Sequence, residues 1–150
     1  MQTQDFVKPT GTLNIVLTDE HGVVKMNVTV PNLVVTTGKT WLAARMANTS
    51  LPAQMSYMAV GQSTQAAAIG DTALYSEAGR AALTTAGGTP SGTSTQFNAT
   101  FSPGVGTGSL TEAAILNASS AGTMLARTVF GVVTKGVNDT VSLTWNVTMS

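Results

Sequence analysis

The last ten residues of the chain place the strongest limit on its fold. From Val141 to Met149 every second residue is large and apolar, and the residues between them are Ser, Thr or Asn. A β-strand with one buried and one solvated face has this period of two, whereas a helix would scatter the apolar side chains around its axis. Trp145 lies in the middle of the apolar face, so we expect its indole in a core.

A second strand is expected just before this one, over residues 123–134. Residues 135–139 separate the two and include Gly, Asn and Asp, which favour turns. The sequence therefore predicts a long antiparallel hairpin at the C-terminal end, around which the other strands assemble.

Shorter alternating segments recur through the rest of the chain. Residues 13–17 and 24–30 predict a hairpin with its turn at 18–22, and further strands are expected near 55–60, 80–84, 97–101 and 110–116. The Gly-rich residues 86–94 suggest an exposed loop or a long hairpin tip. About eight or nine strands with turns between them indicate an all-β fold, a single antiparallel β-sandwich or jelly-roll-like domain with one or two short helices. Residues 1–10 are expected to form a polar N-terminal arm, and residues 11–150 the sandwich domain.

Two short helices are predicted between the strands. The first would be capped by Thr36 or Thr37, and it would dock Trp41, Leu42, Arg45 and Met46 on the sheet. The second would be a helical turn over residues 72–78, capped by Asp71 and ended by Gly79.

The Gly38-Lys39-Thr40 sequence is similar to the end of a phosphate-binding loop. That motif requires a glycine at position 33, which is Leu here. We therefore interpret these residues as a helix start.

Charged residues form only 9% of the chain, against about 25% in an average soluble domain. Seven Lys and Arg balance seven Asp and Glu, so no basic field is available to bind nucleic acid. Polarity comes instead from 25 Thr and 12 Ser. A nearly neutral surface protects poorly against association, which favours a protein whose surface meets other subunits. The alternative is a protein that is merely rich in Thr.

The chain contains no cysteine, which excludes disulfides, Cys-ligated zinc and thiol catalysis. Its first residues lack the basic and apolar regions of a signal peptide, and no apolar run approaches the length that spans a bilayer. We expect a soluble chain, made without export by the general secretory route and without a membrane partner.

Few residues suggest chemistry. His21 is the only histidine and lies in a predicted turn, which disfavours a metal site or a Ser-His-acid triad. Glu112 and Arg127 lie on strands predicted to be neighbours, so we expect a structural ion pair that fixes their register, and Arg80 is expected to serve Glu77 in the same way. The sequence therefore predicts neither an enzyme nor a bound cofactor or metal.

Trp41 and Trp145 lie on predicted apolar faces and are expected to anchor the core or an interface. A carbohydrate-binding module, the main alternative from residue types, would carry exposed aromatic residues in its loops. The Gly-rich loops carry none.

Several segments together match a pattern that we recognise. They are residues 57–61 (YMAVG), residues 70–74 (GDTAL) with Glu77 and Arg80, residues 110–117 (LTEAAILN), residues 122–127 (GTMLAR) and residues 139–147 (DTVSLTWNV). In this order they resemble small virion proteins of tailed bacteriophages, over roughly residues 33–150. Related stretches occur in capsid decoration (cement) proteins and at the base of tail fibres.

The resemblance implies a structural virion protein. Because the chain ends at Ser150 without a fibre extension, we expect a decoration protein on the outer capsid surface, made in the host cytoplasm. Its implied partners are the major capsid protein and copies of itself in trimers or dimers. The alternative is a tail-fibre base or adaptor, or a receptor-binding or carbohydrate-binding module of the tail.

Overall fold

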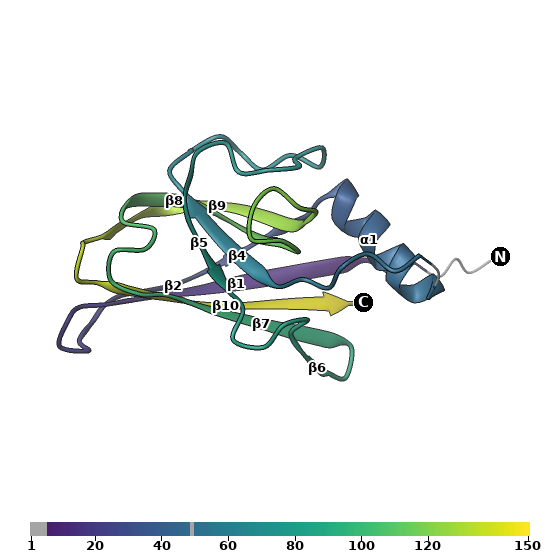
Figure 1. The fold of residues 1–150 in the computed structure, drawn as a ribbon, viewed down its shortest axis with the longest axis horizontal. Coiled ribbons are helices and arrows are strands. Elements are labelled where there is room, and N and C mark those ends of the chain that lie inside the picture. The colour runs from purple at the N-terminus through teal and green to yellow at the C-terminus, as the bar shows by residue number, and fades with distance from the viewer. Residues whose placement is uncertain (1–5, 49) are drawn as a thin grey trace.

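Two antiparallel sheets of five strands each form a sandwich, and one helix lies at one end of it, near both termini (Figure 1). The structure is a computed structural model that describes residues 6–48 and 50–150. The sequence-based prediction of an all-β sandwich is therefore confirmed.

The first sheet has the strand order β2-β1-β10-β7-β6. Its strands are β1 (Pro9–Thr18), β2 (Val24–Pro31), β6 (Thr89–Ser91), β7 (Ser94–Phe101) and β10 (Thr140–Met149). The second sheet has the order β3-β9-β8-β4-β5. Its strands are β3 (Leu33–Val34), β4 (Tyr57–Gly61), β5 (Glu77–Ala82), β8 (Gly108–Leu116) and β9 (Met124–Lys135). The helix is α1 (Thr36–Ala47).

The predicted C-terminal hairpin is wrong. β10 pairs with β1 and β7, whereas β9 pairs with β8 and β3 in the opposite sheet. Residues 136–139 form a turn in which the Asp139 amide donates to the Gly136 carbonyl, and there the chain crosses from one sheet to the other. A turn between two strands does not by itself fix whether they pair.

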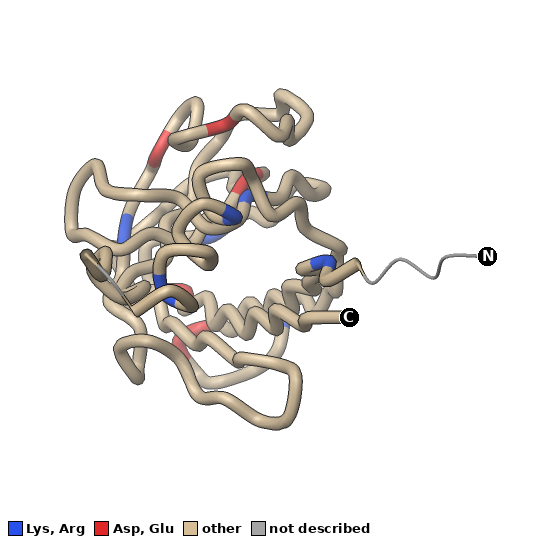
Figure 2. The backbone as a smooth tube through the Cα atoms, turned by 90° about the vertical axis from the view of Figure 1, so that its right-hand side faces the viewer, with Lys and Arg blue, Asp and Glu red and all other residues tan. Residues whose placement is uncertain are grey.

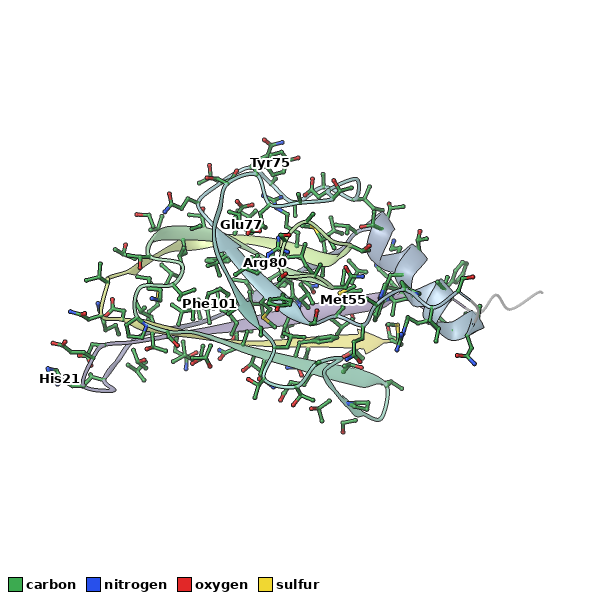
Figure 3. The ribbon with its side chains drawn as sticks, viewed as in Figure 1. His21, Met55, Tyr75, Glu77, Arg80 and Phe101 are labelled. Atoms are coloured by element: carbon green, nitrogen blue, oxygen red, sulfur yellow. The ribbon has the colours of Figure 1, made fainter. Side chains whose placement is uncertain are left out.

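The alternation in β10 does predict its faces. Val141, Leu143, Trp145 and Val147 are buried, and the residues between them are half-buried. Trp145 pairs with Leu13 on one side and with Phe97 on the other, so a row of large side chains crosses the first sheet toward the core. Met55 and Phe101 lie in the interior between the layers (Figure 3).

The second sheet is covered on both faces. Ala113 and Ile115 of β8 face the core between the sheets, whereas Ala114 and Leu116 belong to a second apolar cluster, against which Leu74 packs. Leu74 belongs to the long segment between β4 and β5, which passes over the outer face of the sheet (Figure 1). This cover explains why residues 110–116 are all buried and show no alternation.

The segment that covers the sheet corrects the second predicted helix. Residues 72–78 contain bends and the first residues of β5, and Gly79 lies within that strand instead of ending a helix. Asp71 caps no helix, because its carboxylate is bound by a distant arginine described below.

Helix α1 is present at the predicted place, but its predicted cap is wrong. Val35 is the N-cap and no side chain caps the helix, because the Thr37 hydroxyl donates instead to the Met124 carbonyl of β9, at 2.9 Å. A Cβ on Gly38 would overlap the Leu125 carbonyl oxygen, so this glycine permits close contact of helix and sheet. The glycine of the Gly-Lys-Thr sequence therefore has a packing role.

Two further predictions concern the N-terminal arm and the Gly-rich residues 86–94. The predicted arm extends into the first sheet, since Pro9 and Thr10 begin β1, and residues 1–5 lie outside the described residues. Residues 86–94 include the short strand β6, which pairs with β7, so this segment is a hairpin tip.

Candidate functional site

Arg127 lies at the centre of a buried ion cluster on the outer face of the second sheet. Its Nε and Nη2 atoms donate to Glu112 Oε2 at 3.1 and 2.8 Å, and its Nη1 donates to Asp71 Oδ2 at 2.9 Å. Nη2 also donates to the Gln65 carbonyl at 2.9 Å. Arg127 and Glu112 are 0% exposed. The predicted pair is thus present, within a larger cluster.

The register of β8 and β9 brings the two charges together. Arg127 is paired with Ala114, two residues beyond Glu112, so the two side chains are diagonal neighbours on one face. Both point away from the core between the sheets, toward the segment that crosses above them. The pair therefore fixes the register of the strands and the position of that segment.

Glu112 also accepts hydrogen bonds from the backbone of the covering segment. The Ser76 and Ser63 amides donate to Oε1 at 2.8 and 3.3 Å, and the Tyr75 amide donates to Oε2 at 3.3 Å. A Cβ on Gly61 would overlap Glu112 Oε1 and crowd the Ser76 carbonyl, so glycine ends β4 where the carboxylate requires space. One side chain of β8 thus anchors both ends of the segment.

Asp71 completes the cluster. Burial acts to raise its pKa, but hydrogen bonds from the Ala68 amide, the Tyr75 hydroxyl and Arg127, together with the charge of Arg127, outweigh burial and hold the pKa below its ordinary value. The Tyr75 hydroxyl donates to Asp71 Oδ1 at 3.0 Å, and this hydrogen bond raises the pKa of Tyr75. The Tyr75 ring lies 4.7 Å from the guanidinium carbon of Arg127 and closes the cluster on the solvent side (Figure 3).

Glu77 and Arg80 form a second ion pair, as the sequence predicts, with Nη2 and Oε1 2.6 Å apart. Arg80 Nη1 also donates to the carbonyls of Ala118 and Ala121, at 2.8 and 3.0 Å. Through Arg80 this pair therefore fixes the turn between β8 and β9 to β5.

A third set of charges lies at the turn where the chain changes sheets. Lys25 Nζ is 2.8 Å from Asp139 Oδ2, and the Gly136 amide donates to the same oxygen at 2.7 Å. The hydrogen bond from Lys25 is the main cause of a lowered pKa of Asp139. Burial lowers the pKa of Lys135, whose Nζ donates to the Ser102 carbonyl at 3.0 Å.

The two tryptophans have different places. Trp145 is 0% exposed in the core, and no residue of the described ranges accepts a hydrogen bond from its indole N–H. Trp41 is half-buried on α1, packs against the core and donates through Nε1 to the Ala53 carbonyl at 2.8 Å. Arg45 lies over its ring at 5.8 Å.

Most of the charged side chains described above bind other groups of this chain. Charged residues are few (Figure 2), and Arg127, Arg80 and Lys135 are bound to carboxylates or carbonyls of this chain. His21 lies at the tip of the β1–β2 turn, far from the ion cluster (Figure 3), with Glu20 3.5 Å away. Within residues 6–48 and 50–150, no three His, Asp or Glu side chains converge as a metal site would require. In the same ranges no helix is long and apolar enough to cross a bilayer.

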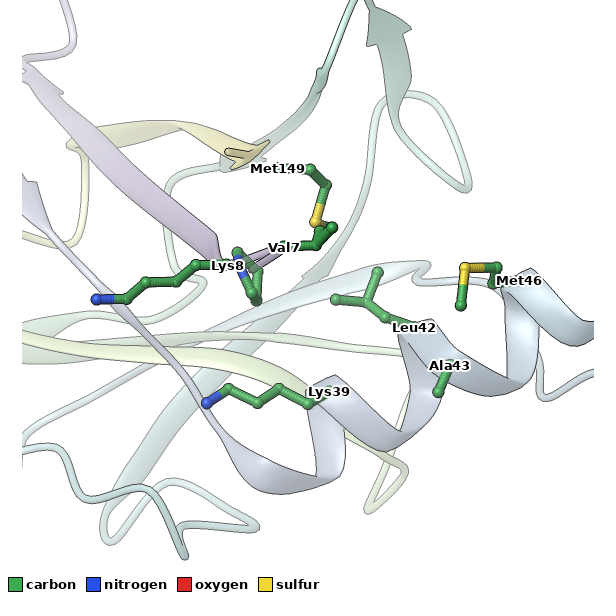
Figure 4. Close-up of a pocket in the computed structure, with 8 residues that line it drawn as sticks. Val7, Lys8, Lys39, Leu42, Ala43, Met46 and Met149 are labelled. Atoms are coloured by element: carbon green, nitrogen blue, oxygen red, sulfur yellow. The ribbon is translucent and has the colours of Figure 1, made fainter. Parts of the chain in front are cut away.

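An apolar groove is the other notable surface feature. It runs between α1 and the chain ends, has a volume of about 500 Å³, and is lined by Val7, Lys8, Lys39, Leu42, Met46 and Met149 among others (Figure 4). The groove is not predictable from local sequence patterns, because its walls come from both ends of the chain and from the helix.

Asp71 and Tyr75 are members of the ion cluster that sequence reasoning missed. Asp71 precedes residues with helical tendency, so a local capping role was assigned to it. Both lie in or beside residues 70–74, one of the segments that carry the resemblance, but nothing in the sequence links these residues to Arg127.

Comparisons with known proteins return no match. Neither a protein-family model, nor a curated protein, nor a solved structure matches this chain.

Proposed function

We propose that this protein is a structural virion protein of a tailed bacteriophage, a capsid decoration protein. In this proposal it binds the outside of the head and stabilises the shell through buried interface area, with no chemical step. Its partners are the major capsid protein and further copies of itself.

One observation carries the proposal. The resemblance to phage virion proteins rests on separate segments, and residues from three of them meet in space. Asp71, Glu112 and Arg127 come from three different motifs and form one buried cluster. Glu77 and Arg80, also part of the motifs, form the neighbouring ion pair. The resemblance therefore includes residues that hold the fold together.

The surface supports the same function. Several large apolar side chains are exposed at places that the core does not use, among them Phe6, Val7, Met46 and Val137. With only 9% charged residues, such a surface is suited to contact with other proteins over a broad area. The exposed faces are otherwise rich in Thr, Ser and Asn, which bury at lower cost than charges.

Sedimentation with purified phage parts tests the proposal. Heads and tails of a phage that encodes this chain are separated, incubated with the purified protein, pelleted and assayed for bound protein. An unrelated β-sandwich of similar size is the control. We expect saturable binding to heads above the control. Retention on tails alone would assign the protein to a tail base or adaptor, and binding to neither part would contradict a virion function.

A further inference from the structure

The groove beside α1 has an open apolar wall. Val7 is 77% exposed and Met46 is 85% exposed, on opposite sides of the groove, with Leu42 between them and Met149 beside Val7 (Figure 4). The N-terminal side is held in place because the Lys8 amide donates to the Ser150 carbonyl, at 2.8 Å, and the Ser150 amide donates to the Lys8 carbonyl, at 3.1 Å. The groove is therefore a fixed feature of the fold.

The charges of the groove are of one sign. Lys8 and Lys39 extend to the same side of it, away from Met46 (Figure 4). Neither ammonium group forms an ion pair with a described residue. An occupant that fits both the apolar wall and the two lysines combines a carboxylate with a neighbouring large apolar side chain.

The chain itself contains such a sequence. Phe6 follows Asp5 directly, and Phe6 is 76% exposed, so it does not fill the groove of its own molecule. We propose that the groove binds residues 5 and 6 of a second copy, with Phe6 against Leu42 and Met46 and the Asp5 carboxylate beside the lysines.

The position of Phe6 determines the symmetry of this contact. Phe6 adjoins Val7, which lines the groove. The inserting side chain and the groove therefore belong to one surface patch. A patch that carries both complementary parts forms a reciprocal contact about a twofold axis, in which each copy inserts its Phe6 into the other.

A small molecule is a poorer occupant. Sites for small molecules combine apolar walls with several converging polar groups that fix the ligand. Apart from Lys8 and Lys39, the side chains that line this groove are apolar. The proposal deepens the self-association that forms part of the proposed function, and it is tested on free protein, so its failure is distinguishable from a failure to bind heads.

Sedimentation equilibrium of free protein is the first test. We expect a monomer–dimer equilibrium, and Phe6→Ser raises the dissociation constant at least about tenfold because it removes a buried aromatic side chain. Val137→Ser, which changes another exposed apolar residue, is the matched control and leaves the constant unchanged. A wild type that stays monomeric at its highest soluble concentration overturns the proposal, as does a Phe6→Ser protein that dimerises like the wild type.

Disulfide trapping between two differently tagged chains is the second test. The protein has no cysteine, so Phe6→Cys in one chain and Met46→Cys in the other provide single reactive thiols. Under mild oxidation we expect a covalent heterodimer in much higher yield than from Phe6→Cys mixed with Val137→Cys. Equal yields from the two mixtures contradict the proposed contact.

Discussion

At the scale of single residues, Arg127 has the most demanding surroundings in the described chain. Its guanidinium is shared by two carboxylates and one carbonyl, and it is fully buried. The extra negative charge is compensated by backbone amides and by the Tyr75 hydroxyl, which donate to Glu112 and Asp71. Removing one member of a buried ion cluster leaves the others without compensation in a region of low dielectric constant.

Arg127→Met should therefore lower the free energy of unfolding by about 3–5 kcal/mol. Methionine keeps an unbranched apolar side chain, so the decrease in the free energy of unfolding results more from the missing charge than from missing volume. Chemical denaturation of the purified variant measures it. Val137→Met, at an exposed residue outside both the ion cluster and the groove, is the control and should stay within about 0.5 kcal/mol of the wild type. A similar small change for Arg127→Met would show that the cluster contributes little.

Trp145→Ala should cost about 3–5 kcal/mol, because the indole is fully buried between Leu13 and Phe97 and its removal leaves a cavity. Trp145→Phe should cost less, since it keeps an aromatic ring and removes an indole N–H that has no acceptor within the described residues. Denaturation curves of both variants provide the comparison. Unchanged stability of Trp145→Ala would contradict the position of the residue in the core.

At the scale of elements, the segment between β4 and β5 depends on β8 for its position. Three amides of this segment, those of Ser63, Tyr75 and Ser76, donate to the Glu112 carboxylate. Without regular secondary structure of its own between residues 62 and 76, the segment obtains its order from these bonds and from Asp71 with Arg127. Loss of the carboxylate should therefore release the segment before it affects the sheets.

Glu112→Gln should raise hydrogen exchange at residues 62–76 more than in the first sheet. Glutamine has an NH2 group in place of one carboxylate oxygen. This group is itself a donor, so it cannot accept the hydrogen bonds that the oxygen accepts. Hydrogen-exchange mass spectrometry measures the exchange of this segment separately from that of the first sheet. Glu77→Gln is the matched control and should instead affect the turn near Ala118 and Ala121, which Arg80 holds. A uniform increase over the whole chain, or none, would contradict local anchoring.

Elements also show how far the sequence determines this fold. The alternation in residues 141–149 predicted the buried face of β10, because a period of two is a local property of the chain. It did not predict the partners of β10, since the turn at 135–139 is compatible with pairing and with crossing to the other sheet. Glu112 and Arg127 were paired correctly because their strands are consecutive. Asp71 was assigned a local cap because its partner lies 56 residues away, and the groove was missed because it is assembled from both chain ends.

At the scale of the whole molecule, two carboxylates make the free energy of unfolding depend on pH in the acidic range. The pKa values of Asp71 and Asp139 are both lowered from the ordinary value of 3.8. A lowered pKa in the folded state means that the unfolded chain binds protons more readily. The stability that these groups contribute is therefore complete above their ordinary pKa and is lost as pH falls through the lowered folded values.

We expect the free energy of unfolding to decrease as pH falls below about 5. Urea denaturation at a series of pH values, from neutral to strongly acidic, measures the slope of the free energy of unfolding against pH. In Asp139→Asn the slope should be smaller, since one of the two titrating carboxylates is gone. Stability that rises toward acidic pH would contradict the ion pairs described here.

The molecule as a whole is a sandwich in which several charged side chains bind other groups of the same chain, and its exposed surface combines apolar residues with few charges. These properties suit a part that adds stability to an assembly by covering it. Heads assembled without this protein provide the most direct measurement, in which purified protein is added back and the temperature of genome release is recorded. We predict that release shifts to higher temperature as binding saturates. An unchanged release temperature on fully occupied heads would contradict a stabilising function.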